Sequence, residues 1–161
     1  MSDVALSTIG MIFGWGVETT KGVKPTTFKE IEECISVGGA SVSVESIETT
    51  CIKNTRKKYT KGLEDAGDSL PVTFNYSDTF LAQWDEMMEA SKTAATEGLA
   101  TWFTVYHPSR TKACFYIVEP GKPGNPEVSV GGNYQIEVGN TLVDIPDDDT
   151  AVQPTAATLG K

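Results

Sequence analysis

The sequence is poor in the residues on which catalysis and metal binding most often depend. Its 161 residues include one histidine, His107, and three widely spaced cysteines, Cys34, Cys51 and Cys114. A Ser-His-Asp or Cys-His site would have to use His107, which precedes a proline in a predicted turn and is expected to be a solvated loop residue. The cysteines lack the close spacing of zinc ligands and are expected to be buried free thiols in a reducing cytosol. We therefore expect a protein that is not an enzyme and that holds neither a metal nor a cofactor.

Long apolar runs and an excess of positive charge are also missing. No stretch approaches the roughly 20 apolar residues of a membrane-spanning helix. The first residues lack the basic segment with which a signal peptide begins, so no signal peptide is expected. The formal net charge of -9 disfavours general nucleic-acid binding, because phosphate binding depends on Lys and Arg side chains that displace counterions. We expect neither membrane insertion nor specific DNA binding.

What the sequence does contain is a series of strand-like segments and one helix. Strand-like patterns occur over residues 28–37, 41–49, 71–76, 100–106, 112–119 and 127–143, the last expected in two pieces broken at Gly131-Gly132. A helix is predicted from Ser77 or Asp78, either of which can cap it, to Gly98, with an apolar stripe around Trp84 that faces the core. Segment 100–106 is apolar on both sides, which indicates a strand buried on both faces or one at a subunit contact.

This order of elements predicts a mainly β fold. Sequential antiparallel strands with one covering helix favour a β-sandwich or partly closed barrel with one α-helix and a long inter-strand loop. Residues 1–27 are expected to form an N-terminal arm, either mobile or an edge strand. Residues 28–145 are expected to form the β domain, and residues 146–161 a flexible acidic and polar tail.

The long loop, residues 50–70, has an unusual distribution of charge. Five of the 13 Lys and Arg residues of the chain lie within nine positions, and an acidic run follows at once. A loop of this length between strands is usually functional when it is ordered, and a solvated, disordered insertion is the alternative. Oppositely charged halves would suit head-to-tail contacts between identical subunits, because each subunit then needs two complementary surfaces. The residues expected at such contacts are Lys53, Arg56, Lys57, Lys58, Tyr59, Lys61, Leu63, Glu64 and Asp65.

Several short motifs around this loop follow the order found in a known family. They are Thr49-Thr50, Arg56 to Tyr59, Lys61 to Gly67, Val72 to Tyr76, a helix from Phe80 to Glu97, and strands at Trp102 to Tyr106, Phe115 to Glu119 and Tyr134 to Val138. In this order, and in an aromatic-x-x-Gly-Leu-x-Asp-x-Gly pattern in the loop, residues 28–145 resemble the major tail tube proteins of long-tailed (siphovirus-type) bacteriophages. The sequence departs from that pattern in its last strand, where EVGNTLV replaces a plainer Thr-Gly ending.

The resemblance implies a non-enzymatic structural protein of the virion tail, assembled in the cytoplasm of the host bacterium. Such subunits form hexameric rings that stack into a tube, with a tape measure, a terminator and a baseplate or tip as further tail proteins. DNA leaves the capsid through the tube without specific binding. The resemblance also implies that the long loop bridges to neighbouring subunits and to the adjacent ring.

In such a tube each subunit lends strands to an inner barrel around the channel. An acidic lining would repel phosphate and let DNA slide. The candidates for this lining are polar residues on predicted strands: Glu30, Glu32, Ser43, Glu45, Gln135 and Glu137.

Two other interpretations stay open. One is a cell-surface or carbohydrate-binding β-sandwich, in which exposed Trp15, Trp102 and Tyr106 would stack on sugar rings. The other is a related tail component, either a tail terminator or a tailocin tube.

Overall fold

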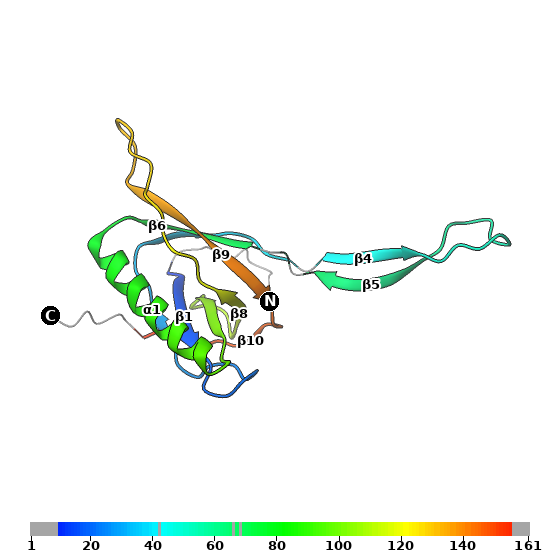
Figure 1. The fold of residues 1–161 in the computed structure, drawn as a ribbon, viewed down its shortest axis with the longest axis horizontal. Helices are drawn as coiled ribbons and strands as arrows, with labels where there is room; N and C mark the ends of the chain where they lie inside the picture. Colours follow the sequence, from blue (N-terminus) through cyan, green and yellow to red (C-terminus); the bar gives the residue numbers. More distant parts are fainter. Residues whose placement is uncertain (1–9, 42, 66, 68, 156–161) are drawn as a thin grey trace.

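The computed structural model describes residues 10–41, 43–65, 67 and 69–155. Its ribbon shows a β body with a helix along one side and two projections that extend away from the body (Figure 1). The elements in chain order are β1 (Ile12–Val17), β2 (Lys29–Glu30), β3 (Cys34–Val37), β4 (Ser43–Glu48), β5 (Tyr59–Asp65), β6 (Ser69–Asn75), α1 (Asp78–Thr96), β7 (Thr101–Tyr106), β8 (Lys112–Glu119), β9 (Gln135–Asp144) and β10 (Asp149–Thr150). In its described part the chain is mainly β with one helix, which confirms the predicted fold class.

Most of the strands belong to one antiparallel sheet. Its order is β2-β1-β7-β8-β9-β6-β3, with β10 paired to β8, while β4 and β5 form a separate two-stranded sheet. The end strands β2 and β3 follow one another in the chain, but within the described residues they do not pair with each other. The sheet is therefore not closed into a barrel, and the fold has the open, sandwich-like form of the predicted class.

The main core lies between this sheet and α1. The Oγ of Ser77 accepts a hydrogen bond from the backbone N–H of Phe80 at 3.2 Å, which caps the helix as predicted. Phe80, Trp84 and Met87 recur at helical spacing and are fully buried. The ring of Phe80 stacks on Phe74 of β6 with 4.6 Å between centroids. The predicted helix and its core-facing stripe are confirmed.

A smaller core covers the opposite face of β7 and β8. Phe28, Trp102 and Phe115 are buried in it, and residues 151–152 near the C-terminus pack against them. Because Trp102 faces this core and Phe103 faces the main one, β7 is buried on both faces. Of the two alternatives for this strand, burial on both faces is confirmed.

Both ends of the described chain pack more closely than the sequence predicts. β1 pairs with β2 on one side and β7 on the other, so the prediction of a mobile arm or edge strand is wrong for this segment. At the other end β10 pairs with β8, Pro154 is buried, and the N–H of Thr155 donates to the carbonyl of Phe28 at 2.8 Å. This part of the predicted flexible tail is packed; residues 156–161 lie outside the described residues.

Three internal predictions also need correction. The single strand expected at residues 28–37 is two short strands, β2 and β3, separated by a turn in which Glu33 adopts a left-handed φ of 70°. Of residues 127–143, only those from Gln135 onward form a strand. The long loop expected at residues 50–70 contains strand β5 and the start of β6.

Candidate assembly surface

The segment predicted as a long loop forms the tip and the second strand, β5, of an antiparallel hairpin. Its first strand, β4, lies within the strand predicted at residues 41–49. The pairing runs from Ser43 opposite Asp65 to Glu48 opposite Tyr59, with a bulge between Val44 and Ser46. Short bonds organise the tip: the N–H of Thr49 donates to the carbonyl of Lys58, and the N–H of Lys58 donates to the hydroxyl of Thr50, both at 2.8 Å. The hairpin is thus an ordered projection with its own ladder.

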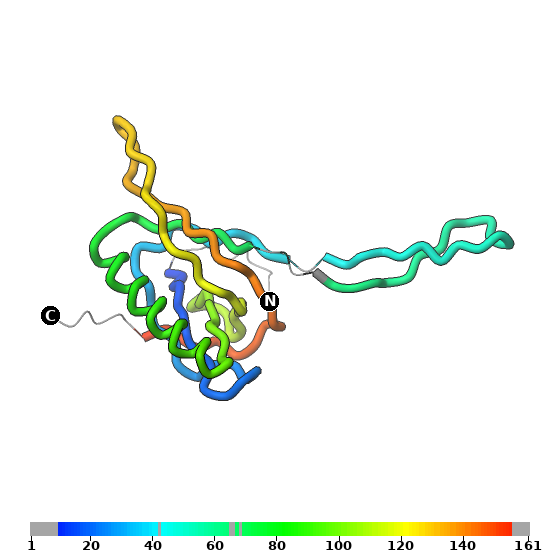
Figure 2. The backbone as a smooth tube through the Cα atoms, in the orientation of Figure 1, coloured from blue at the N-terminus to red at the C-terminus, as the bar shows by residue number. Residues whose placement is uncertain are grey.

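The hairpin lies away from the β body (Figure 2). All six residues of β4 are exposed. β4 and β5 form a two-stranded sheet separate from that of the body. Large apolar side chains on it are open to solvent, among them Leu63 (81% exposed) and Ile52 (104%). An isolated two-stranded hairpin is marginally stable in water at best, and exposed apolar side chains gain nothing from it. The arrangement therefore favours a surface that binds another molecule.

The charges of the hairpin are arranged in two zones. Lys53, Arg56, Lys57 and Lys58 lie exposed at the tip, where residues 51–58 contain no carboxylate. On β5 the ammonium of Lys61 forms an ion pair with the carboxylate of Glu64, three residues away. The nine residues expected at contacts are all on this one projection, the cations at its tip and the positions from Tyr59 to Asp65 on β5.

The predicted channel-lining residues lie in three places rather than one. Glu30 and Glu32 belong to β2 and the turn that follows, where burial, and secondarily repulsion from Glu32, raises the pKa of Glu30. Ser43 and Glu45 are on the hairpin strand β4. Gln135 and Glu137 are on β9 in the body sheet.

The last of these places is a polar sheet face. Residues alternate along β9, so that Ile136 and Val138 are buried while Glu137 is exposed. On neighbouring β6, Thr73 lies directly opposite Glu137 in the ladder, and Ser36 of β3 lies opposite Thr73. The outward face of β3, β6 and β9 therefore presents hydroxyl and carboxylate groups.

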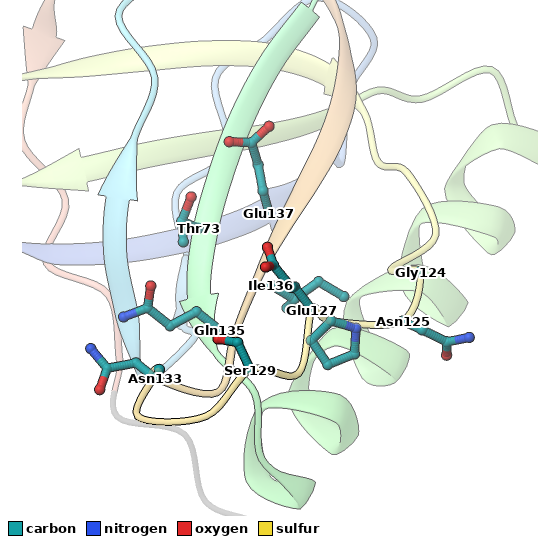
Figure 3. Close-up of a pocket in the computed structure, with 11 residues that line it drawn as sticks. Thr73, Gly124, Asn125, Glu127, Ser129, Asn133, Gln135, Ile136 and Glu137 are labelled. Atoms are coloured by element: carbon teal, nitrogen blue, oxygen red, sulfur yellow. The ribbon is translucent and has the colours of Figure 1, made fainter.

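A pocket of about 440 Å³ lies beside this face. Figure 3 shows Thr73, Gln135 and Glu137 on the adjacent strands. Glu127 and Ser129, from the segment between β8 and β9, lie beside them. Amide, hydroxyl and carboxylate oxygens dominate the lining. Within the described residues no group of three or more His, Cys, Asp or Glu side chains could hold a metal ion.

The second projection, residues 120–134 between β8 and β9, has a fixed base, and sequence reasoning missed it as a functional feature. The indole N–H of Trp84 donates to the carbonyl of Gly121 at 3.0 Å, and the N–H of Gly121 donates to the Oδ1 of buried Asn140 at 2.9 Å. A Cβ atom at Gly121 would lie 2.0 Å from the carbonyl oxygen of Gly139. The only sequence signal for this base was its Pro- and Gly-rich composition.

The candidates for chemistry and sugar binding are placed differently from the predictions. His107 is 7% exposed, and its Nδ1 accepts a hydrogen bond from the N–H of Ser109 at 3.0 Å, so it is a buried turn residue and not a solvated one. Trp15 and Trp102 are buried, which rules out the proposed sugar-stacking face, and Tyr106 is half-buried.

The three cysteines are free, as predicted, but none is in the fully buried class. Cys34 and Cys114 are half-buried, and Cys51 is exposed at the tip of the hairpin. No helix in the described part of the chain is long and apolar enough to cross a membrane.

Comparison with known proteins finds a shared fold but no related sequence. No protein-family model matches the sequence, and no curated protein is significantly similar to it. Among solved structures, the chain is similar to one from the tail of an empty GTA particle, determined by helical refinement with C6 symmetry. That match has a TM-score of 0.53 and 12% identity, and it covers 91% of this chain and 99% of the other.

A second similar chain comes from the six-fold symmetrised baseplate of the anti-feeding prophage (AFP). Its TM-score is 0.52 at 13% identity, covering 94% of this chain and 97% of the other. At these identities the likeness shows a shared fold. The two similar chains come from a tail and from a baseplate.

Proposed function

We propose that the chain is a structural subunit of a bacteriophage-type tail, and that it polymerises as stacked hexameric rings into a tube through which DNA passes. The observation that carries the proposal is the β4–β5 hairpin. It exposes all of β4, carries large apolar side chains in water, and ends in four cations on a chain of net charge -9. These features suit an arm that contacts a neighbouring subunit and the adjacent ring.

The fold supports the same proposal. It is shared, along more than nine-tenths of the chain, with chains from a C6-symmetric tail and a six-fold symmetrised baseplate. Six copies of one chain around an axis need two complementary surfaces on each subunit, and the hairpin supplies one of them. The other proteins of such a tail, a tape measure, a terminator and a baseplate or tip, are the expected partners, and the virion tail is the expected location.

The polar face of β3, β6 and β9 is the best candidate for the channel wall. Its Glu137 and Gln135 project from a strand whose other side is in the core, so these side chains meet solvent without disturbing the fold. Carboxylates facing the channel would repel the phosphates of DNA and prevent sticking. The other four candidates, Glu30, Glu32, Ser43 and Glu45, lie on β2, the turn after it and β4. They would line the channel only if the orientation of each subunit in the ring also turned those parts toward the axis.

Charge reversal at the hairpin tip tests the assembly role. Replacing Arg56, Lys57 and Lys58 by Glu should abolish tubes and rings in negative-stain micrographs and in sedimentation, while the thermal melt stays unchanged. Each exposed ion pair is worth only about 0–1 kcal/mol, but each would recur at every subunit.

The matched control reverses three exposed lysines away from the hairpin, Lys21, Lys92 and Lys122, and so makes the same change in net charge. This control should still assemble. Normal tubes from the tip variant would contradict the proposed role of the tip. Wild-type protein that stays monomeric under all conditions would contradict tube formation itself.

A second candidate is a component that forms a single ring, such as a terminator or baseplate ring. The likeness to the AFP baseplate chain favours it. Micrographs separate the two: single rings that never stack would support this candidate, and long hollow fibres would support the tube.

A further inference from the structure

The body sheet has an open edge beside a groove whose lining is partly apolar. β3 pairs with β6 on one side, and no described strand pairs with its other side. A groove of about 460 Å³ lies between β3 and the start of β1, with β7 and β8 beneath it. Its lining includes Met11, Ile12, Ile35, Val37, Val105 and Tyr116. Ile35 is 45% exposed although it belongs to a strand of the main sheet.

The groove is suited to an apolar, extended chain. Burial raises the pKa of the Cys34 thiol to about 11, and burial is also the main cause of a raised pKa at Tyr116. Both shifts have burial as their main cause, which agrees with the half-buried position of these two residues in the groove. Among the described residues no carboxylate lines the groove. Arg110 does line it, and its guanidinium lies 3.0 Å from the Asp148 carboxylate. The positive charge of Arg110 is thus offset by Asp148, which leaves the lining close to neutral.

The second projection presents a segment with the opposite features. Residues 127–130, Glu-Val-Ser-Val, alternate as a strand does, yet they form no strand with their own chain. Val128 and Val130 are 80% and 107% exposed. Glu127 is the only charged residue among the four. The base of the projection is held by the bonds of Gly121 to Trp84 and Asn140. Glu127 and Ser129 line the pocket beside β9, while Val128 and Val130 are left exposed.

We propose that residues 127–130 of one copy bind as an added strand in the groove between β1 and β3 of a second copy, with Val128 and Val130 directed into it. Alternate side chains of a strand point to one face, so both valines can enter together. The free edge of β3 offers backbone hydrogen bonds, which is how extended segments add to sheets. The contact is head-to-tail, because it joins two different surfaces of the same chain, and it rests on the proposed ring assembly.

Site-specific disulfide formation tests this contact. Two variants are made on a background without native cysteines (Cys34→Ala, Cys51→Ser and Cys114→Ala): one carries Ile35→Cys and the other Val130→Cys. Mild oxidation of the mixed variants should give a covalent dimer on a non-reducing gel, above the level from either variant alone. Lys122→Cys, exposed on the same projection, replaces Val130→Cys as the matched control and should give no such dimer. The thermal melt of each variant verifies that the background folds.

A second measurement avoids the cysteine-free background. The double substitution Val128→Lys and Val130→Lys should abolish assembly of the otherwise natural chain without lowering its melting temperature. The control, Lys122→Glu, should leave both assembly and melting temperature unchanged. Rings or tubes without the mixed dimer would overturn this contact and leave the proposed function standing. A mixed dimer from a protein that never forms rings would support the contact and count against the tube. Neither rings nor dimer would overturn both.

Discussion

The two projections of the molecule reach away from the body by different physical means. The β4–β5 hairpin is ordered along its length by its own ladder and has exposed residues on all of β4. Residues 120–134 have no ladder in their outer part and are fixed at both ends of their base. Gly121 is bonded to Trp84 and Asn140, and the carbonyl of Tyr134 accepts a hydrogen bond from the N–H of Tyr76 at 2.9 Å. Order can thus come from repeated backbone pairing or from a few polar bonds at the base, of which those of Gly121 form a buried anchor.

This difference decides where each projection is sensitive to mutation. Removing part of the hairpin leaves the core untouched, because its side chains contribute nothing to that core. Disturbing the anchor affects the core directly, since Trp84 is fully buried and Asn140 also donates to the carbonyl of Leu70 at 3.1 Å. We therefore expect large effects on stability at the anchor and small ones in the hairpin.

The largest effect is expected for Gly121→Ala. Its new methyl group would lie 2.0 Å from the carbonyl oxygen of Gly139, so a backbone must shift and the anchor bonds must stretch. We expect a loss of about 2–4 kcal/mol in the free energy of unfolding, measured by urea denaturation. The control is Gly124→Ala in the same projection, where an added Cβ meets nothing within 4 Å and the change should stay within about 0.5 kcal/mol. Equal effects of the two substitutions would refute the anchor.

A smaller effect on stability is expected when the hairpin is removed. Because Ser43 and Asp65 lie opposite each other in the ladder, an Asn-Gly turn can join them in place of residues 44–64. The free energy of unfolding of the body should change by less than about 1 kcal/mol, since the deleted strands pack against no core. Assembly should be lost in the same preparation. A loss of several kcal/mol would mean that the hairpin supports the body.

The smallest perturbation is chemical modification of thiols, whose rates should differ between Cys51 at the exposed hairpin tip and Cys34 in the groove of the body. Iodoacetamide at pH 8 should modify exposed Cys51 first, because only about 0.1% of the Cys34 thiol, with its pKa of about 11, is then ionised. Raising the pH to 10 should speed the modification of Cys34 by about a hundredfold, as its thiolate fraction rises. Mass spectrometry of the time course gives both rates. Equal rates at pH 8 would contradict the burial of Cys34.

Helix α1 and strands β4, β7 and β8 were predicted close to their observed bounds. Helix α1 was found because Phe80, Trp84 and Met87 repeat with the period of a helix against the sheet. Of the hairpin, β4 falls within the strand predicted at residues 41–49, and only β5 was missed as a strand. The described residues of β5 include no buried one, so nothing imposes the period-two pattern by which a strand is recognised, and its charged residues look like those of a loop.

Close packing accounts for the failure at β1. Its Gly14 and Gly16 look like loop residues, but each lies where a side chain would collide: a Cβ would be 2.5 Å from Pro154 at the first position and 2.7 Å from the carbonyl of Thr27 at the second. At residues 127–130 the error is the opposite one, because a strand was predicted and none is formed. Their alternation is that of a strand, but a sequence pattern does not reveal whether a partner strand exists in the same chain.

The candidate contact residues were predicted as a group, since all nine lie on one projection. The second projection and its anchor could not be predicted, because the role of Asn140 depends on Leu70 and Gly121, which are distant in sequence. The channel-lining candidates were chosen by strand parity alone. Parity gives the face of a strand but not the sheet to which the strand belongs, and so Ser43 and Glu45 lie on the hairpin rather than in the body.

The length of the hairpin gives it a mechanical property. At about 3.3 Å per residue, the seven residues of β5 span about 23 Å, so a tilt of 10° at the base moves the far end of the strand by about 4 Å. Near the base lie Gly39, where a side chain would meet nothing within 4 Å, and Gly67, with a φ of 88°. In the proposed tube the hairpin would act as a lever. A small rotation of one subunit would displace the far end of its hairpin against the neighbouring subunit, and a stack of such subunits would transmit bending along its axis.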